Sequence, residues 1–155
     1  MIILTTLVRK FRTLWSLDVE SRWLLLQTFL LLPSVALSLK FWGLKFTQAI
    51  LVKLFPIPAS PPPNHSHRLI TTTRMVQLAV KYCQPWANCL KKSLVLWSLL
   101  RAQGIDGQLR IGVRQDAQKF EAHAWVEWQD LILGDRQDVR ERFAMFDRPI
   151  DISSL

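Results

Sequence analysis

The sequence predicts an α+β fold in which helices come first and an antiparallel sheet follows. Before Gly104, apolar residues recur at helical spacing or in long runs, whereas after it they alternate with polar residues. Five prolines between Pro56 and Pro63 separate a Leu-rich first part from the rest. Such a run cannot continue a helix, so it predicts an extended linker. We expect a hydrophobic helical segment over 1–55, a linker over 56–66 and one domain over 67–155.

The composition and charge of the chain limit the classes of protein to which it can belong. The 155 residues are 50% hydrophobic and carry a net charge of +8, which predicts a packed core rather than a disordered tail. The basic balance suits anionic lipid, nucleic acid or an acidic peptide. Because no nucleic-acid motif accompanies it, we do not expect nucleic-acid binding. Cys83 and Cys89 are too few for a disulfide framework, and no secretory cleavage pattern precedes them, so a cytoplasmic location is expected.

The N-terminal part leaves two interpretations open. Asp18 is a good N-cap residue, and the stretch from Trp23 to Leu39 holds seventeen uncharged residues, at the short limit of a bilayer span. One interpretation is association with the inner face of the membrane, in the plane of the interface. The other is a helical pair packed on the rest of the chain or on a partner protein. We favour the second because Gln27, Pro33 and the later lysines weaken a span. Pro33 is expected to kink or end the helix.

The next two helices are predicted from spacing and capping residues. Residues 68–82 follow the i, i+3, i+4, i+7 pattern. Asn88 is a strong N-cap for a helix from Cys89 to about Gln103, and Gly104 is its C-terminal cap. That helix is apolar on most faces, which is typical of a buried central helix. At its first turn, unpaired N–H groups and the helix dipole would favour the thiolate of Cys89 and could receive an oxyanion.

Three strands are predicted after Gly104. Apolar and polar residues alternate from Leu109 to Val113, Phe120 to Trp128 is a second strand, and Leu131 to Leu133 is a third after a tight turn. His123 lies within the second strand, and Asp135 follows the third.

The turn decides whether His123 and Asp135 meet. A three-residue loop, 128–130, would place His123 directly opposite Asp135 on one face of the sheet. A two-residue turn would place Asp135 opposite Ala124 and on the other face. Glu127 is the rival partner for His123, but it lies ~13 Å along the strand, so we rank it below Asp135.

A thiol, an imidazole and a carboxylate in this order are the parts of a nucleophilic hydrolase or acyltransferase. Cys89 would attack a carbonyl carbon. His123 would act as base toward the thiol and as acid toward the leaving amine. Asp135 would hold the imidazole in the right tautomer.

Short motifs around these residues carry a family resemblance. They are Cys89-Leu90, Ser93-Leu94, Leu99-Leu100, Gly104-Ile105, Leu109-Arg110-Ile111-Gly112-Val113, His123-Ala124-Trp125-Val126-Glu127 and Gly134-Asp135. They resemble the transglutaminase-like, papain-related cysteine protease superfamily, and more narrowly the leader-cleaving B proteins of lasso-peptide biosynthesis. The resemblance implies a transglutaminase-like core, in which a central helix with an N-terminal Cys packs on an antiparallel sheet. It also implies a catalytic triad of Cys89, His123 and Asp135.

The resemblance further implies hydrolysis of one peptide bond in a ribosomally made lasso-peptide precursor. The leader is released before a separate, asparagine-synthetase-like cyclase closes the macrolactam. Because residues 1–60 contain no strand-rich recognition module, a separate leader-recognition protein is the expected partner. No cofactor or metal is expected, and whether the maturation complex needs ATP is left open. The alternatives are acyl transfer to an amine on the same fold and a non-enzymatic, membrane-associated scaffold.

Overall fold

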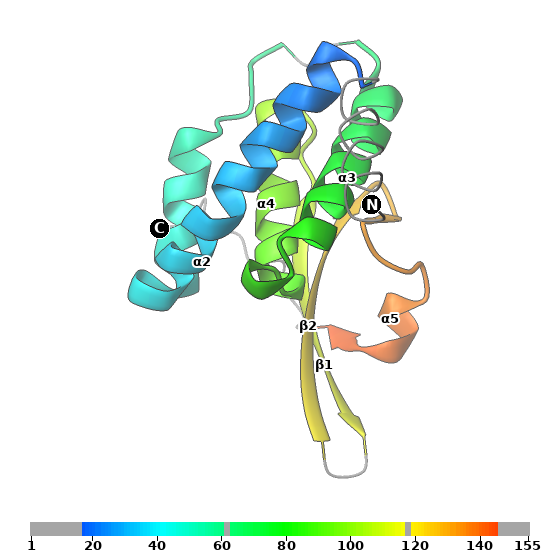
Figure 1. Cartoon of the computed structure of the whole chain (residues 1–155). Helices are drawn as coiled ribbons and strands as arrows, with labels where there is room; N and C mark the ends of the chain where they lie inside the picture. The colour runs from blue at the N-terminus through cyan, green and yellow to red at the C-terminus, as the bar shows by residue number, and fades with distance from the viewer. Residues whose placement is uncertain (1–16, 61–62, 117–118, 146–155) are drawn as a thin grey trace, which may run out of the picture.

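The structure, a computed structural model, describes residues 17–60, 63–116 and 119–145 (Figure 1). Its helices are α2 (Val19–Leu54), α3 (His65–Tyr82), η1 (Gln84–Trp86), α4 (Cys89–Ala102) and α5 (Val139–Arg142). Its strands are β1 (Gln108–Asp116), β2 (Lys119–Trp128), β3 (Leu131–Leu133) and β4 (Ala144–Met145). All four strands are antiparallel, in the order β3-β2-β1-β4. The predicted α+β class is confirmed, whereas α5 and β4 were not predicted.

Helix α2 is a helical hairpin with two arms (Figure 1). Asp18 caps it as predicted, since its carboxylate accepts hydrogen bonds from the backbone N–H and the hydroxyl of Ser21. The chain reverses at Gly43, whose φ of 78° and ψ of −178° suit glycine. Across the reversal, the hydroxyl oxygens of Ser38 and Thr47 lie 2.8 Å apart and join the arms.

The helix does not end at Pro33, one of the two outcomes expected there, because it continues through this residue. The ring of proline fixes φ at a helical value, so the local loss is one hydrogen bond and some crowding of the preceding turn. The neighbouring side chains of Leu32 and Val35 are almost fully buried. Their burial outweighs the local loss at Pro33.

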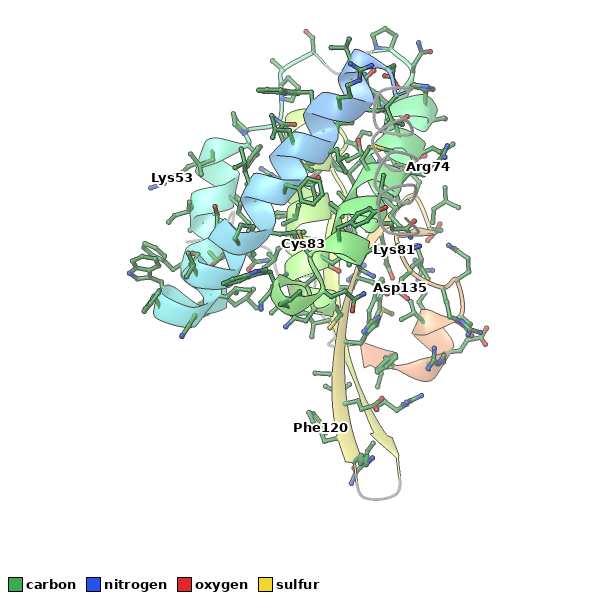
Figure 2. All side chains as sticks on the ribbon, viewed as in Figure 1. Lys53, Arg74, Lys81, Cys83, Phe120 and Asp135 are labelled. Atoms are coloured by element: carbon green, nitrogen blue, oxygen red, sulfur yellow. The ribbon has the colours of Figure 1, made fainter. Side chains whose placement is uncertain are left out.

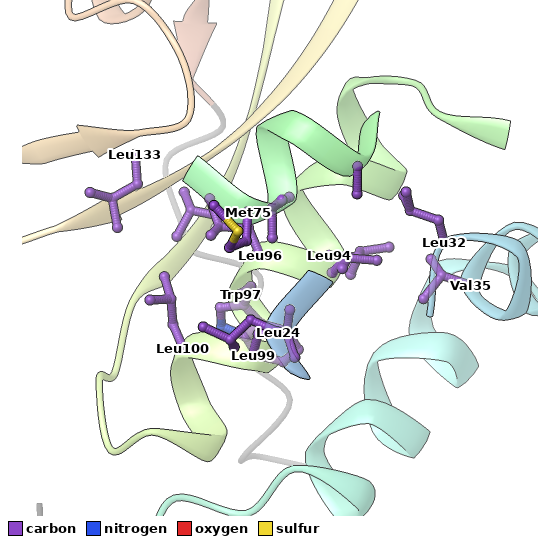
Figure 3. Packing of buried hydrophobic residues seen from close by; sticks show 14 of the residues in the cluster. Leu24, Leu32, Val35, Met75, Leu94, Leu96, Trp97, Leu99, Leu100 and Leu133 are labelled. Carbon is purple, nitrogen blue, oxygen red and sulfur yellow. The ribbon is translucent and has the colours of Figure 1, made fainter. Parts of the chain in front are cut away.

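One hydrophobic core joins α2, α3 and α4 (Figure 3). Leu32 of α2 and Met75 of α3 pack in it against α4, in which every residue from Ser93 to Leu100 is buried. The prediction of a buried central helix is therefore confirmed. Because α2 shares this core, residues 19–54 pack on the rest of the chain, in line with the favoured interpretation, whereas residues 1–16 of the predicted segment lie outside the described residues. The boundary placed at 56–66 stays a prediction.

Helix α2 also has the length and composition of a membrane-spanning helix. Its most apolar window has a mean hydropathy of 1.7, and 33% of that window is buried inside the protein. A core helix near the N-terminus has the same properties, so hydropathy alone does not decide between the two interpretations of this part.

Helix α4 is capped at its C-terminal end as the sequence predicts. Gly104 has a φ of 78°, and the N–H of Ile105 donates to the carbonyl oxygen of Leu100 at 2.9 Å. This is the 6→1 hydrogen bond of a Schellman motif. The chain is thereby turned from α4 into β1.

The sheet is covered on both faces, and β2 alternates between them. Val126 belongs to the core around α4, whereas Trp125 belongs to a second cluster with Ile132, Val139 and Phe143. The segment from 134 to 145 therefore closes over the face of the sheet that α4 does not cover. His123, two residues from Trp125, lies on this second face.

We expect Gly112→Ala to lower the free energy of unfolding by about 1–3 kcal/mol, because the added methyl group overpacks the second face. A Cβ at Gly112 would lie 2.9 Å from the Trp125 ring and 3.0 Å from both the carbonyl oxygen of Ala144 and the Cβ of Phe143. Urea unfolding measures the change. Gly107→Ala is the matched control and should cost less, since its Cβ would have a single contact shorter than 3.4 Å, with Cγ1 of Val126 at 3.1 Å. Equal losses in the two variants would contradict the close packing at Gly112.

Candidate active site

Cys89 is the first residue of α4. The side-chain oxygen of Asn88 accepts a hydrogen bond from the N–H of Lys91 at 2.9 Å, so Asn88 is the predicted N-cap. The carbonyl oxygen of Asn88 accepts from the N–H of Lys92. The backbone N–H groups of Cys89 and Leu90 precede the groups that this cap uses. They lie where the helix dipole is positive and can receive a negatively charged oxygen.

The thiol lies against the strand that carries His123. Cys89 is half-buried, and its Sγ makes a weak contact of 4.0 Å with the carbonyl oxygen of Ala122. One turn further along α4, the hydroxyl of Ser93 donates to the carbonyl oxygen of Ala124 at 2.9 Å. Because residues four apart share one face of a helix, both contacts belong to a single docking of α4 on β2. Within the described residues, Sγ has no hydrogen bond to the imidazole of His123.

Imidazole and carboxylate are in direct contact. Nε2 of His123 and Oδ2 of Asp135 are 2.7 Å apart. The ring stacks on Phe143, at 5.0 Å between ring centroids, and on Trp125, at 6.2 Å. With Nε2 committed to Asp135, Nδ1 is the ring nitrogen left for another partner. The structure thus brings His123 and Asp135 together and sets Cys89 beside the residue before His123.

The length of the turn, which the sequence analysis left open, is settled by the pairing of β2 with β3. Trp128 pairs with Leu131, so the turn has two residues, Gln129 and Asp130, and the second of the two alternatives is the one that the structure adopts. Both turn residues have positive φ, at 46° and 66°, as a type I′ turn requires.

The expected consequence of a two-residue turn, separation of Asp135 from His123, is wrong. The β2–β3 ladder ends at the pair Val126 and Leu133. Asp135 lies beyond this pair, so the register of the ladder does not fix its position. Gly134 has a φ of 71° and redirects the chain immediately after the last paired residue. That bend returns the carboxylate of Asp135 to the face of His123.

Asp135 is also tied to α4. The ammonium group of Lys92 donates to the carbonyl oxygen of Gly134 at 2.9 Å and lies 3.5 Å from Oδ2 of Asp135. Partial burial raises the pKa of Asp135. The backbone N–H of Arg136, the bond to His123 and the charge of Lys92 outweigh burial, so the pKa lies below its ordinary value of 3.8. Asp135 is therefore a carboxylate at neutral pH and can orient an imidazole.

Glu127, the rival partner of His123, is held elsewhere. Its carboxylate accepts hydrogen bonds from Trp125 Nε1 at 2.7 Å, Arg140 Nε at 2.9 Å and Arg110 Nε at 3.2 Å. Burial raises the pKa of Glu127, but the bonds from Arg140 and Trp125 and the two guanidinium charges bring it below its ordinary value. This buried, fully paired carboxylate joins β1, β2 and α5, so its role is structural.

A cavity of about 660 Å³ lies beside the start of α4. Leu37, Lys40 and Leu44, from the region where α2 reverses, line it on one side. Trp86 and the two neighbours of Cys89, Asn88 and Leu90, line it on the other. It offers a mainly apolar space at the first turn of α4, with Lys40 and Lys91 on its wall. The sequence could not indicate it, because its walls are about fifty residues apart.

The comparison with protein families decides the family of this site. A family model described as the transglutaminase-like superfamily matches residues 31–146, about three quarters of the chain. The chain belongs to the transglutaminase-like superfamily. Members of this superfamily are commonly cysteine-based enzymes and include both peptidases and acyltransferases. No curated protein and no solved structure matches the chain.

The transglutaminase-like match spans more than the segment that carries the sequence resemblance. It begins in the first arm of α2 and continues through α3, α4 and the sheet to β4. Lys92 lies inside it and was not singled out from the sequence. Its spacing of three residues from Cys89 was the available signal, since it places both residues on one helix face.

The lowered pKa of Asp135 makes part of the stability depend on pH. A folded-state pKa below 3.8 means that the carboxylate's contribution is complete well above pH 4 and is lost as the pH falls through the folded-state pKa. We expect the stability difference between wild type and Asp135→Asn to be large at pH 7 and to shrink toward pH 3. Urea unfolding at both pH values measures it, with Asp106→Asn, a mostly exposed carboxylate, as the control. A pH-independent difference for Asp135→Asn would contradict the assignment.

The charge of Lys92 helps to keep the pKa of Asp135 low. Lys92→Met retains the apolar stem of the side chain but removes the charge and the bond to Gly134. We expect the pKa of Asp135 to rise toward its ordinary value in this variant. Carbon-13 NMR titration of the aspartate carboxyl groups measures the shift. Lys91→Met removes the adjacent charge as the control and should leave Asp135 unchanged, and an unchanged titration in Lys92→Met would show that Lys92 does not act on Asp135.

Proposed function

We propose that the chain is a cysteine peptidase that removes the leader from a ribosomally made lasso-peptide precursor, with Cys89, His123 and Asp135 as its triad. The observation that carries the chemistry is the 2.7 Å contact between His123 and Asp135. His123 lies on β2, the strand against which the Cys89 thiol lies. Membership of the transglutaminase-like superfamily supports a thiol-based enzyme. The motifs from Cys89-Leu90 to Gly134-Asp135 support the narrower assignment to leader cleavage.

In the first half of the proposed reaction, Nδ1 of His123 takes the proton of the Cys89 thiol, and the sulfur attacks the carbonyl carbon of the scissile peptide bond. The N–H groups of Cys89 and Leu90 receive the resulting oxyanion. His123 then gives the proton to the departing amine, and the carbon–nitrogen bond breaks. The products of this half are the free amine of the core peptide and a thioester between Cys89 and the leader.

In the second half, water replaces the amine. Nδ1 of His123 takes a proton from water as its oxygen attacks the thioester carbon, and the proton returns to sulfur as the carbon–sulfur bond breaks. Asp135 accepts from Nε2–H throughout, which keeps Nδ1 available as the base and stabilises the imidazolium between the transfers. Lys92, through Asp135 and Gly134, positions the orienting carboxylate.

The cavity at the start of α4 suits one side of an extended peptide, because Asn88 and Leu90, the two sequence neighbours of Cys89, line it. Residues 17–60 are helical or irregular, so a strand-rich leader-recognition module is absent from this described stretch. Capture of the leader by a separate recognition protein is therefore part of the proposal. A separate, asparagine-synthetase-like cyclase would then use the free amine of the core peptide.

The test is cleavage of a precursor peptide, followed by mass spectrometry, with the recognition protein present. We expect wild type to release leader and core by addition of one water. Cys89→Ala and His123→Ala should remove activity almost completely, and Asp135→Asn should lower kcat roughly 10³- to 10⁴-fold. Cys83→Ala is the matched control, since its thiol is also free and half-buried but lies at the end of α3.

Two outcomes would overturn the peptidase assignment. A product with a new amide bond in place of a free leader carboxylate would indicate acyl transfer, the other activity found in the superfamily. Full processing by Cys89→Ala would exclude a thiol enzyme and favour a non-enzymatic scaffold.

A further inference from the structure

An apolar stripe runs along the outer face of the first arm of α2. It consists of Trp23, Leu26, Leu30, Leu37 and Phe41, which are 47–66% exposed. At about 100° per residue these five side chains lie within about 60° of one another. The stripe is about 27 Å long, and the opposite face of the same arm is buried in the core around α4. A stripe of this size on a soluble protein marks an interaction surface.

The stripe ends in an aromatic cluster where α2 reverses. Phe41, Trp42 and Phe46 are 45–66% exposed. The Trp42 ring lies 5.8 Å from Phe41 and 5.6 Å from Phe46 between centroids. The exposed Lys40 and Lys45 flank the cluster, and the ammonium group of Lys40 lies 5.9 Å from the centre of the Phe41 ring. Exposed aromatic rings next to lysines are typical of surfaces that sit at the boundary between water and lipid.

Charge is segregated between the two halves of the molecule. Residues 21–105, which include α3, α4 and all of α2 except its first two residues, contain ten Lys and Arg and not one Asp or Glu. Residues 106–155 contain seven Lys and Arg against ten Asp and Glu, a net charge of −3. The helices carry this positive half, and the β1–β2 hairpin projects away from them (Figure 1). A partner of the stripe must therefore be both apolar and anionic.

We infer that the outer face of α2 docks on an anionic lipid bilayer, with the helix lying in the plane of the interface. Such a surface accepts the stripe and the aromatic cluster at the level of the headgroups, while their phosphates pair with Lys40, Lys45 and Lys53. Figure 2 shows Lys53 on the outer side of the second arm. This inference goes beyond the proposed function, because it holds whatever chemistry Cys89 performs.

The same helix cannot dock in this way and also span the bilayer. Spanning would remove Leu24, Leu32 and Val35 from the core that α2 shares with α3 and α4. It would also require the hairpin at Gly43 to open. In-plane docking keeps both features and leaves the folded structure unchanged.

Docking would bring the candidate active site close to the lipid. Leu37 belongs to the stripe, Lys40 flanks the aromatic cluster, and both line the cavity beside Cys89. Figure 2 places Phe120 near the far end of the β1–β2 hairpin, away from the helices. Phe120 is 71% exposed and Lys119 is exposed too, so this pair offers a matched control on the other half of the molecule.

Co-sedimentation of the purified full chain with vesicles tests the inference. We expect binding to vesicles that contain phosphatidylglycerol, weak binding to pure phosphatidylcholine, and weakening at high salt. Lys40→Glu with Lys45→Glu should lower the affinity for anionic vesicles more than tenfold, since each neutralised lysine alone is worth about fivefold. Leu26→Ser with Leu30→Ser should lower it in the same vesicles. Lys119→Glu with Phe120→Ser should bind like wild type.

Three results would overturn the inference: equal binding to neutral and anionic vesicles, wild-type binding by both α2 variants, or a concentration-dependent dimer that Leu26→Ser with Leu30→Ser abolishes. The last result would assign the stripe to a second copy of the chain. All six substituted side chains are exposed, so we expect the variants to fold, and circular dichroism checks this. Vesicle binding is read without substrate, so loss of peptide cleavage alone bears on the proposed function and not on docking.

Discussion

The shortness of the β2–β3 ladder is the constraint on which the candidate site depends. The ladder ends at Val126 and Leu133, so no strand among the described residues covers this edge of β2 next to His123. Helix α4 occupies that edge instead, through the Ser93 hydroxyl on Ala124 and the Cys89 thiol near Ala122. A longer β3 would pair with these carbonyl groups and exclude the start of α4. The thiol lies beside the imidazole strand because the third strand stops early.

Asp135 joins the two elements that the short ladder brings together. Its Oδ2 contacts His123 on β2. The ammonium group of Lys92 on α4 donates to the same oxygen and to the carbonyl oxygen of Gly134. The second apolar cluster supports the His123 ring, since Phe143 stacks on this ring and packs with Trp125. Gly112 leaves the space that this packing requires. The imidazole is thus fixed by a carboxylate on one side and aromatic rings on its faces.

The parts of the fold that were predicted carry local signals. Asn88 and Gly104 mark the ends of α4, and alternation marks β1 and β2, because caps and pleats act within a few residues. The place of the tight turn was predicted, but its length was left open, since Gln129 and Asp130 adopt positive φ without a glycine to indicate it. Strand β4 has two residues and exists only through pairing with β1. The contact of His123 with Asp135 was anticipated, but its cause, the bend at Gly134, acts outside any register that a sequence pattern encodes.

The segment that carries Asp135 has a thermodynamic consequence of its own. Residues 134–145 are anchored by a small apolar cluster and a few polar contacts, whereas α4 is embedded in the main core. Segments with so little buried surface open with a lower free energy than the whole fold. In molecules opened in this way, the helices are intact while the imidazole has lost its carboxylate. On heating, the contact between His123 and Asp135 is therefore lost at a lower temperature than the helices.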